Sequence, residues 1–261
     1  MIRGLWERET IALLILAAAL PVGIAGAVEG GWAFATTFTL ALAVLAFWQG
    51  VFLFARAQLA TGIGVLTALA VTLLGPQGLA PWQIILGVSF GAVIGEQVFG
   101  GWGRNIINTA VASLAFLFFA FPEAVTPEPG WLIAVSSVPG AALLVVLGVL
   151  AWPIPVGAIM GIATVGLLMG ADLSVLFSHG AIVFGIVFLS GDPVTSSATP
   201  AGRWAYGGLA GGLAGLLGWA AYGVGAPQTI VFATLLASLF APLIDHTVIT
   251  ISAAARKRRH G

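Results

Sequence analysis

Long apolar runs follow one another along the chain, separated by short stretches with glycine, proline or charged residues. A helix needs about 20 consecutive apolar residues to cross a membrane, whereas transmembrane barrel strands alternate apolar and polar residues over about ten positions. The pattern predicts an all-α polytopic membrane protein with about ten transmembrane helices, in which residues 1–261 form a single integral membrane domain. The expected spans are residues 10–27, 32–55, 60–75, 81–99, 105–121, 131–150, 154–170, 174–190, 204–223 and 228–251.

The composition excludes soluble and disordered classes. Of the 261 residues, 60% are hydrophobic and 7% are charged, whereas soluble domains carry roughly 25% charged residues and disordered chains combine low hydrophobicity with high charge. The absence of cysteine excludes disulfides and thiol catalysis by this chain. The three histidines are too scattered in sequence to predict a metal site, and no basic face predicts binding to nucleic acid.

The basic residues predict the orientation in the membrane. With ten spans and both termini in the cytoplasm, every Lys and Arg falls on the cytoplasmic side, as the positive-inside rule expects. These residues are Arg3, Arg8, Arg56, Arg104, Arg203 and the run 256–259; the opposite side receives Glu29, Glu123, Glu128 and Asp172. The basic tail is interpreted as a determinant of topology, with lipid binding or docking of a partner as the alternative.

Two similar segments suggest an internal repeat. Gly91-Ala92-Val93-Ile94 and Gly180-Ala181-Ile182-Val183 each precede a polar, glycine-containing stretch. Five helices followed by five more give halves of opposite orientation, here residues 10–122 and 131–252, and such proteins bind ligands where the halves meet. Glycine-rich packing faces could also produce this similarity by chance. Gly208, Gly212 and Gly215 are interpreted as a surface for close helix packing.

The first polar cluster surrounds the start of the 105–121 span. Asn105 and Asn108 are three residues apart, so the sequence predicts that they share one helix face. Their amides could bind a flat heteroaromatic ligand, and the glycines at Gly101 and Gly103 would let the backbone approach it. The alternative is that Asn105 caps the helix and Asn108 bonds a neighbouring helix.

The second cluster follows the 174–190 span. Asp192 before Pro193 predicts a helix start, with the acid as N-cap. The hydroxyls that follow, Thr195 among them, make the segment a candidate ligand or cation site, with an ordinary loop as the alternative. Asp245 and His246 could relay protons within the last span, or could simply reach water at its cytoplasmic end.

At these two clusters the sequence resembles one membrane family. The runs that carry the resemblance are 99–108 with 115–122, and 191–196 with 202–207; the region of Leu66, Pro76 and Trp82 is also similar. The family contains the NqrB component of the Na⁺-translocating NADH:quinone reductase and the RnfD component of the Rnf electron-transport complex. The resemblance implies ten helices in two inverted halves, a fold like that of urea transporters.

The resemblance also implies flavin cofactors. Asn105, Asn108, Asp192 and Pro193 match the positions at which the family holds a non-covalent riboflavin near the cytoplasmic side. A second flavin, FMN, is attached in the family to a threonine in an extracytoplasmic loop. The nearest stretch here is residues 136–142, where Ala142 stands at the attachment position, so covalent FMN is expected to be absent.

Two further positions depart from the family pattern. Thr109 replaces the usual proline after the second asparagine, and Glu96 stands where members often carry lysine. The chain is also short for the family, so the resemblance identifies it as a reduced and divergent member.

The resemblance implies a membrane electron-transfer subunit that binds riboflavin or another non-covalent flavin. Its expected partners are the other membrane redox subunits of an Rnf- or Nqr-like complex, the lipid bilayer and a quinone, and its expected location is the bacterial inner membrane. Coupling to Na⁺ or H⁺ movement, and whether the subunit is itself catalytic, stay open. The alternatives are a small-solute channel or transporter on the same fold and a scaffold subunit without cofactor.

Overall fold

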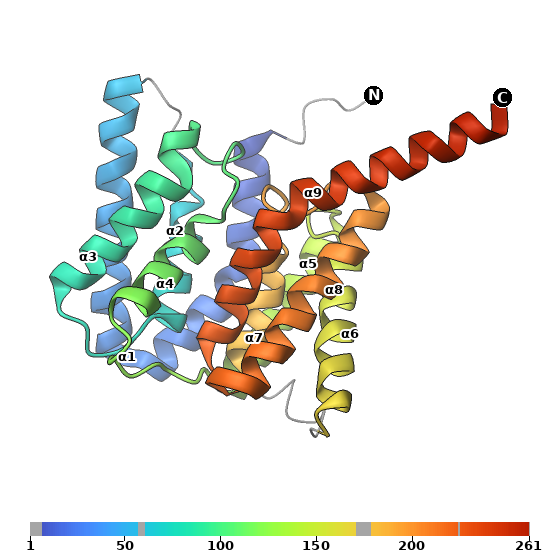
Figure 1. The fold of residues 1–261 in the computed structure, drawn as a ribbon. Coiled ribbons are helices and arrows are strands. Elements are labelled where there is room, and N and C mark those ends of the chain that lie inside the picture. Colours follow the sequence, from blue (N-terminus) through green and yellow to red (C-terminus); the bar gives the residue numbers. More distant parts are fainter. Residues whose placement is uncertain (1–6, 57–60, 171–178, 224, 261) are drawn as a thin grey trace.

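The computed structural model describes residues 7–56, 61–170, 179–223 and 225–260 of the chain. Helices pack side by side as a bundle in Figure 1, and within the described residues there is no strand. In chain order the helices are α1 (Arg8–Arg56), α2 (Gly64–Leu74), α3 (Pro81–Phe90), η1 (Gly91–Glu96), η2 (Gln97–Phe99), α4 (Thr109–Ala120), α5 (Trp131–Val146), α6 (Pro153–Leu168), α7 (Gly180–Phe184), η4 (Gly185–Ser190), α8 (Pro200–Leu217), η5 (Gly218–Tyr222) and α9 (Pro227–His260).

The first two expected spans are joined in α1, a single helical element of 49 residues. The helix breaks at Gly31, whose φ of 52° and ψ of −128° lie outside the helical region. A positive φ favours glycine, which has no Cβ to clash with the backbone. The two halves of α1 run in opposite directions in Figure 1, so this element crosses the bundle twice.

Several expected spans form shorter helices than predicted. Among the described residues, three helical segments are long and apolar enough to cross a membrane alone: Arg8–Arg56, Pro81–Phe99 and Pro227–Ala255. The expected 60–75 span contains only the 11 residues of α2, and in the described part of the 174–190 span the helix begins at Gly180. All this fits a helical membrane protein, while ten crossings in two inverted halves stay a prediction.

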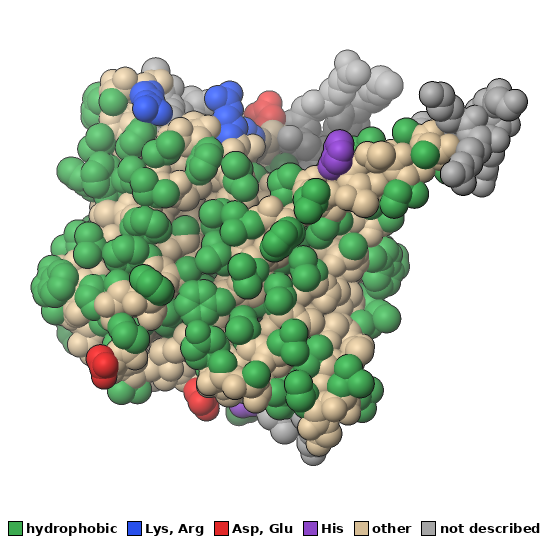
Figure 2. All heavy atoms as spheres, viewed as in Figure 1, with side chains coloured by type: hydrophobic (Ala, Val, Ile, Leu, Met, Phe, Trp, Pro, Cys, Tyr) green, Lys and Arg blue, Asp and Glu red, His purple; other side chains and the backbone are tan. Residues whose placement is uncertain are grey.

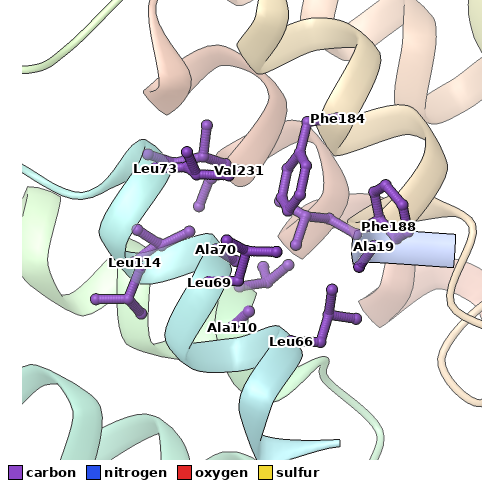
Figure 3. Close-up of a cluster of buried hydrophobic side chains, with 14 of the residues drawn as sticks. Ala19, Leu66, Leu69, Ala70, Leu73, Ala110, Leu114, Phe184, Phe188 and Val231 are labelled. Atoms are coloured by element: carbon purple, nitrogen blue, oxygen red, sulfur yellow. The ribbon is translucent and has the colours of Figure 1, made fainter. Parts of the chain in front are cut away.

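The two short helices form the centre of the core. Nearly every residue of α2 is buried, and so is nearly every residue of the segment Gly180–Ser190 formed by α7 and η4. In the close-up of Figure 3, Leu69 and Leu73 of α2 and Phe184 of α7 belong to one apolar cluster. Side chains of α1, α4 and α9 complete this cluster, including Ala19, Leu114 and Val231.

Glycine brings α6 and α8 into backbone contact. A Cβ added at Gly161 would lie 2.5 Å from the Gly208 carbonyl oxygen and 2.6 Å from the Gly212 nitrogen. A Cβ at Gly211 would overlap the Ala158 carbonyl group in the same way. Of the three glycines predicted to pack closely, Gly215 would place a Cβ 2.8 Å from the Val165 Cβ, whereas a Cβ at Gly208 or Gly212 would meet nothing within 4 Å. The prediction is therefore confirmed at Gly215 only, and the other close contacts of α8 are made by Gly207 and Gly211.

Charged side chains are distributed unevenly over the molecule. In Figure 2 the visible Lys and Arg side chains lie at one end, while acidic side chains lie at the opposite end and also beside the basic ones. This agrees with the predicted grouping of basic residues, although the orientation in a membrane stays a prediction.

Two neighbouring glycines of α8 provide a matched test of this packing. Gly211→Ala is expected to destabilise the protein by about 1–3 kcal/mol, because overpacking forces backbone shifts. Gly212→Ala is the control: its Cβ would meet nothing within 4 Å, so its stability should be unchanged or slightly raised by helix propensity. The readout is the midpoint of thermal unfolding in detergent, followed by tryptophan fluorescence. Equal losses in both variants would contradict the close contact.

Candidate functional site

Asn108 caps the start of α4. Its Oδ1 accepts hydrogen bonds from the backbone N–H groups of Ala110 at 2.9 Å and Val111 at 3.3 Å, which have no partner within the helix. Its φ of −61° and ψ of 132° are extended, as expected of an N-cap. The helix therefore begins after both asparagines, and the prediction that Asn105 and Asn108 share a helix face is wrong.

Asn105 instead fixes the glycine-rich loop before α4. Its Oδ1 accepts from the Gly103 N–H at 3.1 Å, and its Nδ2 donates to the Ile107 carbonyl at 3.0 Å. Gly101 and Gly103 both have positive φ, which explains why this loop needs glycine. The amide of Asn105 is thus paired with its own loop, and the side chain is 4% exposed.

Asp192 organises the connection between η4 and α8. Its Oδ1 accepts from the Val194 N–H at 3.1 Å and its Oδ2 from the Thr195 hydroxyl at 3.1 Å. These bonds form a local turn, and α8 begins only at Pro200 with Thr199 as its cap, so the prediction of a helix start at Asp192 is wrong. Burial raises the pKa of the Asp192 carboxyl, while the hydrogen bonds from Val194, Asn108 and Thr195 oppose that shift.

The structure brings Asn108 and Asp192 together, although they are 84 positions apart in sequence. Asn108 Nδ2 donates to Asp192 Oδ2 at 2.9 Å. Both residues border a small cavity of about 20 Å³ between the start of α2 and the end of η4. Its other walls are largely apolar: Ile15, Ile63, Leu66, Trp102, Leu144, Val149, Leu150, Val187, Phe188, Gly191 and Pro193.

A second buried carboxylate lies beside the start of α4. Glu96, the last residue of η1, is 3% exposed, and its Oε2 accepts from the Thr109 hydroxyl at 2.7 Å. Its Oε1 accepts from the Gln97 amide at 3.0 Å. Glu96 and Thr109, which the resemblance singled out as further departures from the expected family pattern, are hydrogen-bonded to each other. Sequence analysis singled out both residues but gave no signal that they are in contact.

The packing of η1 on α4 explains why Glu96 reaches this position. A Cβ at Gly91 would lie 2.7 Å from the Thr109 carbonyl oxygen, and one at Gly95 would lie 3.1 Å from the Ala112 Cβ. Both glycines are therefore needed for close approach. The π-helical turn of η1 then ends with Glu96 next to the first residue of α4.

Arg8 attaches the start of α1 to the same region. Its guanidinium donates to the carbonyl oxygen of Trp102 in the glycine-rich loop, and Trp102 is itself buried at 5% exposure. This contact places a positive charge near Glu96 without a direct ion pair in the described residues, and it connects α1 to the glycine-rich loop.

Asp245 of α9 positions the segment that carries Asp192. Its Oδ1 accepts from the Ser197 hydroxyl at 2.5 Å and from the Thr199 hydroxyl and N–H at 2.6 and 3.0 Å, and its Oδ2 accepts from the Ala198 N–H at 2.9 Å. Sequence analysis considered Asp245 as part of a proton relay. The structure assigns it these four hydrogen bonds, while the neighbouring His246 is exposed.

The opposite end of α2 borders a larger polar crevice of about 680 Å³. Glu29 of α1 and Glu128 of the 121–130 connection line it, together with Thr72 at the end of α2. The 121–130 connection also provides a hydrogen-bond partner for the backbone after α2, because the Gln77 N–H donates to the Val125 carbonyl at 2.7 Å. Apolar side chains of the central core separate this crevice from the Asn108–Asp192 cavity.

Comparison with known proteins identifies the family. The sequence model of the family described as NQR2, RnfD, RnfE matches residues 3–141 and 130–253. The chain belongs to this family. Several curated relatives are named as the NqrB component of Na(+)-translocating NADH-quinone reductase. The protein from Yersinia pestis is 31% identical over 88% of this chain and 72% of its own length, and that from Chromohalobacter salexigens is 27% identical over 98% and 75%.

The expected flavin of the NQR2, RnfD, RnfE family can be tested against this geometry. Amide, hydroxyl and carboxylate groups around Asn108 suit the polar edge of a flavin ring. The cavity is too small for the ring, however. Its volume of about 20 Å³ admits roughly one water molecule, whereas pockets for ligands of drug size measure about 300–1,000 Å³. The polar side chains are also paired within the protein, so a flavin does not fit the conformation described here.

The structure also places the stretch compared with the family's FMN-attachment loop. Residues 136–142 lie inside α5, within the expected 131–150 span, so they do not form an extracytoplasmic loop like the one to which the family attaches FMN. The Ser136 and Ser137 hydroxyls both donate to the Ile133 carbonyl within this helix, at 3.1 and 2.7 Å. Ala142 is exposed on the same helix, and it carries no hydroxyl that could be esterified.

Replacing Asp245 tests whether it holds the 197–199 segment. Asp245→Asn removes the charge and one acceptor, so we expect a loss of about 1–3 kcal/mol in stability, as measured for hydrogen bonds to charged groups. His246→Asn is the matched control on the same turn, because its side chain is exposed. The unfolding midpoint and proteolysis between residues 192 and 200 are measured. An Asp245→Asn variant as stable and protease-resistant as the control would contradict this role.

Proposed function

We propose that this chain is a membrane subunit of a redox complex of the Nqr or Rnf type, located in the bacterial inner membrane with both termini in the cytoplasm. Family membership and the names of the relatives support the type of complex. The grouping of basic residues in the sequence supports the orientation. Its partners would be the other membrane subunits of that complex and a quinone.

We further propose that the subunit carries electrons on a non-covalent flavin bound between the start of α4 and the Asp192 segment. The hydrogen bond between Asn108 and Asp192 is the observation that carries this proposal. It unites two positions, far apart in sequence, that the resemblance assigns to a single site. In the present conformation these side chains bind each other, so flavin binding would require the bond to open and the cavity walls to separate.

The role of the protein at such a site would be to bind and orient the ring. Asn108 Nδ2 can donate to a ring acceptor, and Asp192 can accept from a ring N–H or a ribityl hydroxyl. A flavin supplies the redox chemistry when bound, and the surrounding groups tune it. Since the closed cavity does not admit the ring, no step of electron transfer is assigned to individual residues.

A channel or transporter on the same fold is supported less well. The polar crevice and the Asn108–Asp192 cavity lie at opposite ends of α2, and a polar solute would have to pass the apolar side chains of Leu69, Leu73 and Phe184. A scaffold subunit without cofactor is consistent with the closed cavity, and it is the alternative that the following experiment addresses.

Gently purified protein is expected to contain flavin, detected by absorbance after acid extraction. Asn108→Ser should lose most of it, because serine keeps an oxygen that can cap α4 but has no amide to donate. Thr164→Ser is the control, since Thr164 is exposed on α6 and does not border the cavity. Colourless wild-type protein, purified with its partner subunits, would refute flavin binding and support a scaffold.

No covalent flavin is expected on this chain. After co-expression with a flavin transferase, a denaturing gel should show no fluorescent band, because Ala142 has no hydroxyl and the hydroxyls of Ser136 and Ser137 are bonded inside α5. Thr126, which borders the polar crevice, is the residue to replace if a band appears. A band lost in Thr126→Val would show that the attachment site lies in the 121–130 connection.

A further inference from the structure

The last helix is longer than a membrane crossing requires. α9 has 34 residues, which correspond to about 51 Å at 1.5 Å per residue, whereas the hydrocarbon core is about 30 Å thick and about 20 residues cross it. Counted from Pro227, the crossing is complete near His246. A crossing that began at Pro227 would thus leave the rest of α9 beyond the hydrocarbon core.

The contacts of α9 end at the same point. Asp245 is held by Ser197, Ala198 and Thr199, but the following turns are mostly exposed, including Ile249 at 56% and Ile251 at 64%. Figure 1 shows that the last turns extend away from the other helices. We call residues 246–260 the C-terminal arm.

The arm has an apolar face and a basic end. Val248, Ile251 and Ala255 follow one another at intervals of three and four residues, so they share one side of the helix. The opposite side carries His246, Ile249, Thr250 and Ala253. The arm ends with the run Arg256-Lys257-Arg258-Arg259, which contains four of the nine basic residues of the chain.

We propose that the C-terminal arm lies on the membrane surface and binds anionic lipid headgroups. An apolar helix face beside basic residues is the pattern of a helix that rests at the interface, and basic residues next to a crossing helix are attracted to anionic lipid. Figure 2 shows other basic side chains at the end of the molecule from which the arm extends. A lipid surface covers the side with Val248, Ile251 and Ala255 and neutralises the basic run at once.

Single-cysteine labelling can test the arm directly, because the chain has no native cysteine. Nitroxide labels are placed on the apolar face with Ile251→Cys or Ala255→Cys, and on the opposite face with Thr250→Cys or Ala253→Cys. The full chain is reconstituted in nanodiscs of phosphatidylcholine, with or without phosphatidylglycerol. Collision with oxygen and with a polar nickel chelate then reports the depth of each label.

With phosphatidylglycerol, the two labels on the apolar face are expected to become several-fold less accessible to the nickel chelate, while the opposite face stays accessible. Replacing residues 256–259 with glutamine should abolish this difference. Equal accessibility of both faces in anionic lipid would refute the proposal. Protection that appears only with the partner subunits, in either lipid, would also refute it and identify the arm as a protein-docking helix.

Discussion

Two helices too short to cross the membrane determine much of this structure. α2 and the α7–η4 segment rise only about 16 Å each, about half of a hydrocarbon core of about 30 Å, so non-helical connections continue the chain from both of them. No water is available at membrane depth, and every backbone group there needs a protein partner. Apolar packing of Leu69 and Phe184 fixes the two helices. Hydrogen bonds provide partners for backbone groups nearby: Asn108 accepts from the N–H of Ala110, and the Gly180 N–H donates to the Pro129 carbonyl.

At the start of α4, the N–H groups of the helix end and two buried carboxylates all need hydrogen-bond partners. Asn108 and Thr109 are consecutive, yet each binds a different buried carboxylate, Asp192 and Glu96. The positive end of the helix dipole favours negative charge at this position. A proline in place of Thr109 would offer Glu96 no hydroxyl, so the hydrogen bond between them depends on both residues.

The sequence predicted the elements better than their contacts. The 81–99 span was correct at both ends, because Pro81 suits a first helical position and Gly100 adopts a positive φ after it. The Asp192 prediction failed because Thr199–Pro200 has the same N-cap and proline signature seven residues later and starts α8. Contacts such as Asn108–Asp192 join distant segments, so no local spacing encodes them.

The two ends of the Asn108 amide have separate functions, and this separation matters for any ligand. Oδ1 caps α4, whereas Nδ2 binds Asp192. A ligand acceptor could therefore replace Asp192 at Nδ2 while the cap stays intact, so α4 need not lose its first turn. Asp192 would retain the bonds from Val194 and Thr195, and Asp245 would still hold the segment behind it. Opening the site thus breaks one hydrogen bond and moves apolar walls, without unfolding either polar segment.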